Sequence, residues 1–270
     1  MTWAGQAAIV TGASGGIGEE IAVQLATAGA RVTLAARRPD ELERVATRCR
    51  SASGRTDDAI LVVPCDVTDR TQCESLVASA VAAFGGIDVL VNNAGQGMWG
   101  RADEVSDLSI YEAMLRVNYL SAVWLTLAAL PHLKTSRGRV LAVGSLSGKI
   151  GVPLRSGYAA AKHALTGFMD SLRIELDGTG VSVTMIHPGF VTTGSQARNL
   201  GTDGRALGAM PLKVSGGQTP DECAAMLLAG AALRKRDIVP GFRARLGLWL
   251  KLLAPTVVDN MASKAIRGRQ

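Results

Sequence analysis

Tyr158 and Lys162 stand four residues apart in the sequence. Residues 158–176 have the pattern of a helix, and on a helix this spacing places both side chains on one face. A tyrosine hydroxyl with an ordinary pKa near ~10 is a poor acid or base at neutral pH, but a neighbouring ammonium group stabilises the phenolate and lowers that pKa. The pair could therefore give or take a proton in a reaction. Taken alone, the same spacing is also that of an ordinary amphipathic helix.

Two further polar residues bear on this interpretation. Ser145 follows the apolar run 140–143, which we predict to be a buried strand, and open α/β sheets bind ligands at the carboxyl ends of their strands. It precedes Tyr158 by 13 residues, and its hydroxyl could donate a hydrogen bond to a substrate carbonyl oxygen. Ser147 is the alternative, and a simple turn role is open for either serine. Asn118 lies in an apolar helical stretch, where a satisfied buried amide is the alternative to a functional role.

A glycine-rich segment, residues 11–18, follows the first predicted strand and has the sequence Thr-Gly-Ala-Ser-Gly-Gly-Ile-Gly. Glycine permits a tight turn and lets backbone N–H groups at the start of the next helix approach a pyrophosphate. A simple turn is the alternative. The position directly after the first strand favours a dinucleotide site.

The end of the second predicted strand indicates which dinucleotide would bind. In NAD-binding folds an acid at this point bonds the ribose hydroxyls, and it would repel a 2′-phosphate. Ala36 occupies that position here, and Arg37 follows with a guanidinium able to bind a phosphate through two hydrogen bonds. Solvated surface charge is the alternative for Arg37 and Arg38. We therefore expect NADP(H) rather than NAD(H).

The elements that position these residues alternate along the chain. Short runs rich in Val, Ile and Leu, each typical of a buried parallel strand, lie at residues 7–10, 32–35, 60–63, 89–91, 140–143 and 181–186, and residues 238–239 could add a seventh. Helical stretches separate them. This order predicts an α/β fold with a doubly wound parallel sheet of about seven strands flanked by helices. We expect one Rossmann-fold domain over residues 1–240 and a C-terminal extension over 241–270.

Four motifs follow one another in this frame: Thr11-Gly12-x-x-x-Gly16-x-Gly18, Asn92-Asn93-Ala94-Gly95, Tyr158-x-x-x-Lys162 and Pro188-Gly189-Phe190-Val191-Thr192-Thr193. Through them the sequence resembles the short-chain dehydrogenase/reductase (SDR) family from residue 6 to about residue 240. The resemblance implies an NADP(H)-dependent oxidoreductase that transfers hydride between the nicotinamide and a carbonyl or secondary alcohol. The chain departs from many NADP-using members at Gly15, where they carry a basic residue.

The resemblance also implies a catalytic set of Asn118, Ser145, Tyr158 and Lys162. Ser145 and Tyr158 would bond the substrate oxygen, and Tyr158 would transfer its proton. Asn118 would kink its helix and hold a water that links Lys162 to solvent. Lys162 would also bind the nicotinamide ribose.

The same resemblance outlines the cofactor site. Asp66 and Val67 would border the adenine, although capping of the following helix or turn is the alternative for Asp66. Asn92 would lie near the adenosine ribose, and Thr193 would contact the carboxamide. The expected cofactor-binding residues are Gly12, Ser14, Gly15, Gly16, Ile17, Gly18, Arg37, Arg38, Asp66, Val67, Asn92, Ala94, Gly95, Tyr158, Lys162, Pro188, Gly189, Val191 and Thr193.

In this family the segment after Gly189 is a mobile substrate loop, and here residues 194–218 carry six glycines, which suits a lid that orders on binding. Several apolar residues could line a pocket next to Ser145 and Tyr158, namely Met98, Trp99, Leu154, Phe190, Met210 and Leu212. They point to an apolar carbonyl substrate. Ordinary core packing is the alternative for each of them.

The formal net charge of +6 comes from the C-terminal part of the chain. Residues 234–270 contain nine Lys or Arg and two Asp, which gives 9 − 2 = +7 and leaves −1 for residues 1–233. This part also contains an apolar helical stripe of Leu246, Trp249, Leu250 and Leu253, which is too short to span a bilayer. An interfacial membrane helix, a subunit contact and packing on its own domain are the alternatives.

Other classes of function find little support. The basic tail lacks a nucleic-acid module, and neither the four cysteines nor the three histidines have the spacing of a metal site, so we expect reduced thiols, no metal and no nucleic acid. The first residues leave no room for an export signal, and we expect a cytoplasmic homodimer or homotetramer, with peripheral membrane contact open. A catalytically inactive nucleotide-binding regulatory protein is the rival function, but it would have to explain an intact proton-transfer set.

Overall fold

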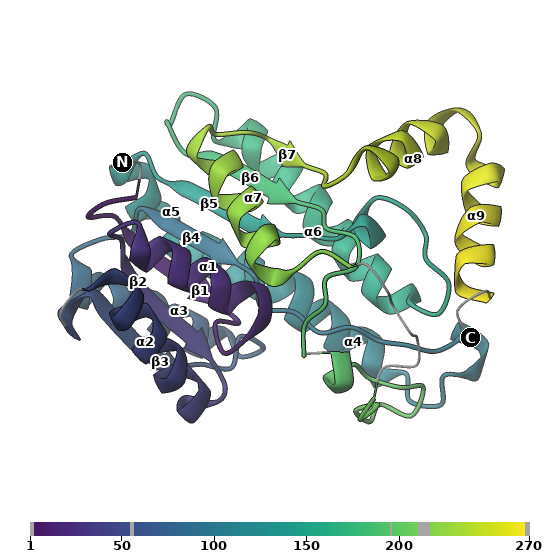
Figure 1. The fold of residues 1–270 in the computed structure, drawn as a ribbon, viewed down its shortest axis with the longest axis horizontal. Helices are drawn as coiled ribbons and strands as arrows, with labels where there is room; N and C mark the ends of the chain where they lie inside the picture. The colour runs from purple at the N-terminus through teal and green to yellow at the C-terminus, as the bar shows by residue number, and fades with distance from the viewer. Residues whose placement is uncertain (1–2, 55–56, 195, 210–216, 268–270) are drawn as a thin grey trace.

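Seven parallel strands form a single sheet in the order β3-β2-β1-β4-β5-β6-β7 (Figure 1). They are β1 (Ala7–Thr11), β2 (Arg31–Ala36), β3 (Ile60–Pro64), β4 (Val89–Asn92), β5 (Arg139–Val143), β6 (Ser182–Ile186) and β7 (Asp237–Ile238). This computed structural model describes residues 3–54, 57–194, 196–209 and 217–267. The predicted doubly wound α/β fold is confirmed, including the short seventh strand.

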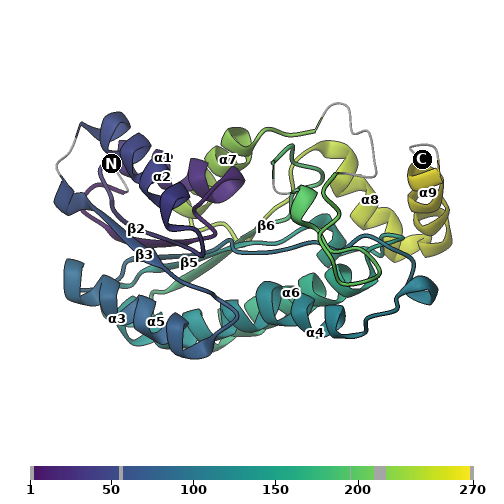
Figure 2. The same ribbon diagram turned by 90° about the horizontal axis from the view of Figure 1, so that it is seen from below.

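Helices cover both faces of the sheet (Figure 2). One face carries α1 (Gly16–Thr27), α2 (Pro39–Ser53) and α7 (Pro220–Ala232), and the other carries α3 (Arg70–Phe84), α5 (Ser121–Ser136) and α6 (Ser156–Glu175). Successive strand residues point to opposite faces, so Ile9 belongs to the core on the α3 and α5 side and Val10 to the core on the α1 side. Because both faces are buried, the strands read as continuous apolar runs.

Ion pairs to a buried glutamate hold the helix that follows the glycine-rich segment. Glu19, in the first turn of α1, accepts two hydrogen bonds of 2.7 Å from Arg44 of α2 and another from Arg48. The hydrogen bond from Arg44 is the main reason why the pKa of Glu19 lies below its usual value, although burial opposes this. The start of α1 is thus fixed relative to α2.

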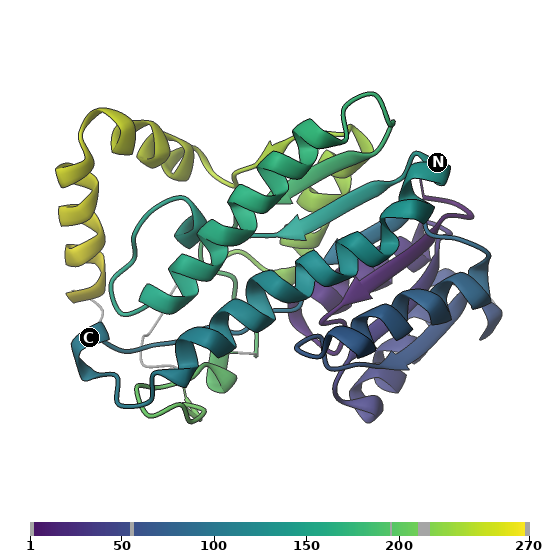
Figure 3. The same cartoon turned by 180° about the vertical axis from the view of Figure 1, so that it is seen from behind.

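A long helical stretch, residues 109–136, is apolar enough to cross a membrane by length and composition. Its Leu125, Ala129 and Leu133 side chains belong to the core on the α3 and α5 side of the sheet. Figure 3 shows the long helix lying across this face of the sheet. The sequence predicted one helix over 108–130, and the family resemblance implied a kink at Asn118. The structure has α4 (Ser109–Leu115), a π turn η3 (Arg116–Leu120) and then α5, and π turns of this kind are common at functional sites.

Two C-terminal helices, α8 (Phe242–Leu253) and α9 (Pro255–Arg267), extend from one end of the domain and contact each other (Figures 1 and 3). The Lys251 ammonium donates a 2.6 Å hydrogen bond to the Lys149 carbonyl, which joins α8 to the domain. The helices expose the apolar side chains of Phe242, Leu246, Trp249, Leu252, Leu253, Val257 and Met261. Packing on the domain therefore leaves most of the predicted apolar stripe uncovered, although Leu250 is half-buried.

Candidate active site

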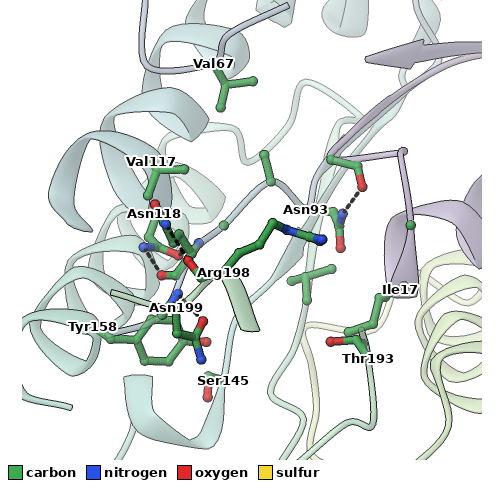
Figure 4. A pocket seen from close by; sticks show the side chains of 18 of the residues that line it. Ile17, Val67, Asn93, Val117, Asn118, Ser145, Tyr158, Thr193, Arg198 and Asn199 are labelled. Atoms are coloured by element: carbon green, nitrogen blue, oxygen red, sulfur yellow. Dashed lines mark hydrogen bonds between the residues drawn. The ribbon is translucent and has the colours of Figure 1, made fainter. Parts of the chain in front are cut away.

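The strand order reverses between β1 and β4, and a cavity of about 550 Å³ opens at the carboxyl ends of these strands (Figure 4). It is large enough for a small-molecule ligand. The lining includes all four residues that the sequence predicted to be catalytic, Asn118, Ser145, Tyr158 and Lys162. It also includes most of the predicted cofactor residues, namely Gly12, Ser14, Gly15, Gly16, Ile17, Arg37, Arg38, Asp66, Val67, Ala94, Gly95, Pro188, Gly189, Val191 and Thr193.

The glycines of the β1–α1 loop have different tasks. Gly12 and Gly16 have φ angles of 65° and 59°, a backbone conformation that side chains disfavour. Gly18 does not line the cavity: a Cβ atom there would lie 2.4 Å from the Gly12 carbonyl oxygen and from Asn93 Nδ2. It allows α1 to start directly against the loop. The loop is thus a cradle of backbone at a helix start, which fits the phosphates of a dinucleotide.

Arginines surround the end of β2. Arg37 follows Ala36 directly and lines the cavity, while Arg38 donates a 3.1 Å hydrogen bond to Ser14 Oγ and lies 3.6 Å from the carboxylate of Glu41. A third guanidinium, that of Arg198, reaches across the cavity toward Asn93 (Figure 4). The pKa of Arg198 lies below its usual value because of burial and the positive charges of Arg38 and Arg37. This end of the cavity is therefore strongly electropositive.

The sequence analysis did not single out Arg198, which lies in the glycine-rich segment 194–218, because no local pattern there indicates a cofactor contact. Hydrogen bonds hold that segment to residues 96–100: Gln96 Nε2 donates to the Arg198 carbonyl at 2.8 Å, and Asn199 Oδ1 accepts from the Gly97 N–H at 3.0 Å. These contacts span about a hundred residues of sequence, so they appear only in the folded chain.

The two polar residues predicted at the adenosine have different outcomes. Asp66 lines the cavity, and its Oδ1 accepts hydrogen bonds from the backbone and side chain of Thr68, which is the turn role left open from the sequence. The helix cap belongs to Asp69 instead. Asn92, predicted near the adenosine ribose, is not among the lining residues: its side chain is buried and donates to Thr126 Oγ1 on α5 at 3.0 Å. Asn93 lines the cavity and binds the Thr11 carbonyl.

Ser145, Tyr158 and Lys162 come together at the end of β5. The Lys162 ammonium is buried, donates a 2.9 Å hydrogen bond to the Val143 carbonyl and lies 5.8 Å from the centroid of the Tyr158 ring. Burial lowers the pKa of Lys162. Burial would raise the pKa of Tyr158, but the charges of Lys162 and Arg155 and a hydrogen bond with Ser145 outweigh it, so this pKa lies below its usual value. The Tyr158 hydroxyl is therefore a stronger acid than that of an ordinary tyrosine.

Asn118 occupies the π turn at the base of this group. Its Nδ2 donates to the carbonyls of Gln96 at 2.9 Å and Met114 at 3.0 Å, and its Oδ1 accepts from the Gln96 N–H at 3.3 Å. A Cβ atom on Gly95 would lie 2.8 Å from Asn118 Oδ1 and 3.6 Å from Lys162 Nζ. The amide therefore reaches the same small space as the lysine.

The apolar residues predicted at the substrate differ in position. Trp99 and Phe190 line the cavity, but Met98 and Leu154 do not. Met98 is fully buried, and its sulfur accepts a hydrogen bond from the Gly157 N–H, so core packing is its role. Met210 and Leu212 lie outside the described residues. Arg155 and Asn199, which the sequence reasoning missed, do line the cavity, and the spacing of Arg155 three residues before Tyr158 was an available signal.

A partly buried hydrogen bond supports the strand that leads into the site. His187, at the end of β6, lies 2.7 Å from the carboxylate of Asp237 on β7. Burial opposes ionisation of Asp237, but His187 and Lys149 outweigh it and lower the pKa of this carboxyl to about 2.

The four cysteines are free and buried, and burial raises the pKa of Cys49 and Cys223 to about 12, so these thiols are unreactive.

Comparison with known proteins gives the class of this chain. Residues 6–203 match the family model described as short chain dehydrogenase. A dehydrogenase/reductase SDR family protein 7-like protein of Anopheles gambiae is 36% identical over 257 residues, which is 94% of this chain and 80% of that protein. Two crystal structures are also similar. An SDR of unknown function from Caenorhabditis elegans, solved with cofactor, is 27% identical with a TM-score of 0.78 over 89% of this chain and 96% of its own. An alcohol dehydrogenase from the archaeon Thermococcus sibiricus, complexed with 5-hydroxy-NADP, is 28% identical with a TM-score of 0.74 over 87% of this chain and 95% of its own.

The chain belongs to the short-chain dehydrogenase/reductase family and is an oxidoreductase of that family.

Proposed function

We propose that the protein is an NADP(H)-dependent oxidoreductase that interconverts an apolar carbonyl compound and its secondary alcohol. The observation that carries this proposal is the meeting of Ser145, Tyr158 and Lys162 at one end of the cavity, with a lowered pKa at Tyr158. A bound nicotinamide would supply or accept the hydride. The residues around it would orient the substrate and move the proton.

In reduction, Ser145 and Tyr158 would donate hydrogen bonds to the carbonyl oxygen, where negative charge develops. Tyr158 would then give up its proton, and the buried Lys162 ammonium would stabilise the phenolate that remains. Asn118 would hold the water through which Lys162 exchanges protons with solvent. Oxidation of an alcohol would use the same groups in reverse.

The choice of NADP(H) rests on the arginines at the end of β2. Ala36 leaves no carboxylate at that point, and Arg37 and Arg198 line the same cavity as the phosphate loop. A 2′-phosphate would neutralise this concentrated positive charge, which NAD(H) would leave unpaired. The bound NADP analogue of the alcohol dehydrogenase from Thermococcus sibiricus is consistent with this choice.

The experiment that tests the proposal is a fluorescence titration with NADPH and NADH, followed by a panel of carbonyl compounds with NADPH consumption as the readout. We expect tighter binding of NADPH and turnover of at least one apolar ketone or aldehyde. An inactive nucleotide-binding protein would bind NADPH and turn over nothing. Equal kcat/KM with NADH and NADPH would contradict the choice of cofactor.

The exposed apolar side chains of α8 and α9 suit a membrane surface or a second subunit. Arg243, Arg245 and Lys251 flank them, which favours anionic lipid over a neutral protein surface. We propose a peripheral membrane contact for a cytoplasmic enzyme that assembles as a homodimer or homotetramer. Co-sedimentation with anionic liposomes should fall sharply when residues 242–270 are removed, and sedimentation velocity of the same variants reports the assembly.

A further inference from the structure

Arg155 places a guanidinium beside the reacting group of the site. Its guanidinium carbon lies 4.3 Å from the centroid of the Tyr158 ring and 5.6 Å from the centroid of the Trp99 ring. Arg155 Nε is buried and finds no hydrogen-bond acceptor among the described residues. A buried donor without a partner costs free energy, which an incoming acceptor would recover.

The backbone before Arg155 is held in an unusual conformation. Leu154 has a φ of 66°, a left-handed conformation that a leucine rarely adopts. Its carbonyl accepts a 2.8 Å hydrogen bond from the Gly100 N–H, one residue after Trp99. Strain of this kind persists where the surrounding structure enforces it, and it is concentrated at functional sites. Here it sets the position of Arg155 between the two rings.

The charges along the cavity are unbalanced. Among the described residues that line it, six are cationic (Arg37, Arg38, Arg116, Arg155, Lys162 and Arg198) and one, Asp66, is acidic. The proposed function uses Arg37, Arg38 and Arg198 for the cofactor phosphate end and Lys162 for proton transfer. Arg116 is exposed on the π turn. Arg155 is therefore the cation beside Tyr158 whose hydrogen-bond donors the proposed function does not use.

We propose that Arg155 binds a carboxylate of the substrate, so that the compound reduced is an oxo acid whose remaining part is apolar. A guanidinium presents donors in a planar fork that matches a carboxylate, and its cation–π contacts with Trp99 and Tyr158 hold it beside the Tyr158 ring. Trp99 and Phe190 supply apolar surface for the rest of the molecule. This inference rests on the proposed function and names its substrate class.

Arg155 also has an effect on Tyr158 that is independent of the substrate. Its charge contributes to lowering the pKa of Tyr158. Loss of that charge would alter proton transfer to every substrate equally. A carboxylate subsite, in contrast, acts only on substrates that carry the carboxylate, so paired substrates separate the two effects.

The test uses phenyl-substituted oxo acids of different chain lengths, each paired with its methyl ester. We expect wild-type kcat/KM to favour the best acid over its ester by about tenfold to a hundredfold, the range that one charge-assisted ion pair supplies. Arg155→Met should abolish this preference, mainly by raising KM for the acid. Arg155→Lys, which keeps the charge and loses the fork, should retain part of it.

Arg101→Met is the matched control, because Arg101 is exposed and pairs with Asp103 at 2.7 Å outside the cavity. It should leave the acid preference unchanged. NADPH titration of each variant confirms that the fold and cofactor site persist. Calorimetry adds a readout without turnover: the wild-type complex with NADP⁺ should bind a phenyl carboxylic acid more tightly than its amide, and the Arg155→Met complex should not.

The outcomes distinguish failure of the carboxylate subsite from failure of the proposed oxidoreductase function. If wild type reduces the esters as well as the acids, or Arg155→Met slows both equally, the carboxylate subsite is wrong and the oxidoreductase stands. If no acid, ester or other carbonyl compound consumes NADPH, the proposed function itself is wrong, and the subsite with it.

Discussion

The two ends of the cavity are built differently. At the cofactor end the backbone of residues 11–18 and 36–38 shapes the site, whereas at the substrate end side chains from separate loops shape it. Gly18 packs so closely that a Cβ would lie 2.4 Å from a carbonyl oxygen. At the substrate end, Trp99, Arg155 and Asn199 project from segments tied by long-range hydrogen bonds, such as Leu200 N–H to the Gly97 carbonyl at 3.0 Å. The residues that shape the cofactor end are therefore close together in the sequence, whereas those at the substrate end come together only through long-range contacts.

The largest expected effect on cofactor binding comes from adding a methyl group at the cofactor end. Gly18→Ala places a Cβ against the Gly12 carbonyl and Asn93 Nδ2, and overpacking of this kind costs about 1–3 kcal/mol while displacing the loop. We expect NADPH affinity to fall by about a hundredfold, measured by fluorescence titration.

The control is Gly167→Ala in α6, where an added Cβ meets no atom within 4 Å. Alanine is the better helix former, so the melting temperature should hold or rise slightly. Wild-type NADPH affinity in Gly18→Ala would show that the backbone contact does not shape the cradle.

A second prediction concerns the arginines that we expect to bind the 2′-phosphate of NADP(H). Arg198 comes from the substrate side of the chain but reaches the cofactor end, so Arg198→Met should weaken NADPH binding about tenfold, as should Arg37→Ala. NADH binding, measured in the same titrations, should change little in both variants. An equal loss for both cofactors would mean that the arginines do not contact the 2′-phosphate.

The pH profile reports on the substrate end. Reduction needs Tyr158 protonated, so its rate should fall as pH rises through the Tyr158 pKa, which lies below the ordinary value near ~10. Oxidation needs the phenolate and should show the opposite trend. Because Arg155 helps to lower this pKa, Arg155→Met should move the alkaline fall of the reduction rate to higher pH. An unchanged pH profile in Arg155→Met would mean that the charge of Arg155 does not lower the pKa of Tyr158.

The smallest effect concerns the strand beneath the substrate end. The pKa of Asp237 falls from its ordinary 3.8 to about 2 in the folded state, so the groups around this carboxylate, chiefly His187 and Lys149, contribute up to about 2 kcal/mol to stability. That contribution is fully present above about pH 4 and is lost as pH falls toward about 2. The free energy of unfolding, measured with urea at several pH values across this range, should fall more steeply with decreasing pH in wild type than in Asp237→Asn. An identical pH dependence in both proteins would mean that the fold does not stabilise the Asp237 carboxylate.

The same contrast explains what the sequence could predict. The strand runs, the glycine loop, Ser145 in preference to Ser147, and the pair Tyr158 and Lys162 are local patterns, and the structure brings these residues to one cavity. Met98 carried no signal that distinguishes core from pocket, because both environments select apolar side chains. Asn92 and Asn93 are adjacent and alike, and only the direction in which each leaves β4 separates them.

The central claim is that Tyr158 transfers the proton while the cofactor carries the hydride, and Tyr158→Phe tests it most directly. Once a reducible carbonyl compound is found, NADPH consumption and NADPH affinity should be measured on the same preparations of wild type and variant. We expect turnover to fall by about a thousandfold while the NADPH Kd changes little, because the phenyl ring keeps the packing and loses the proton. Near wild-type turnover in Tyr158→Phe with intact NADPH binding would contradict the account.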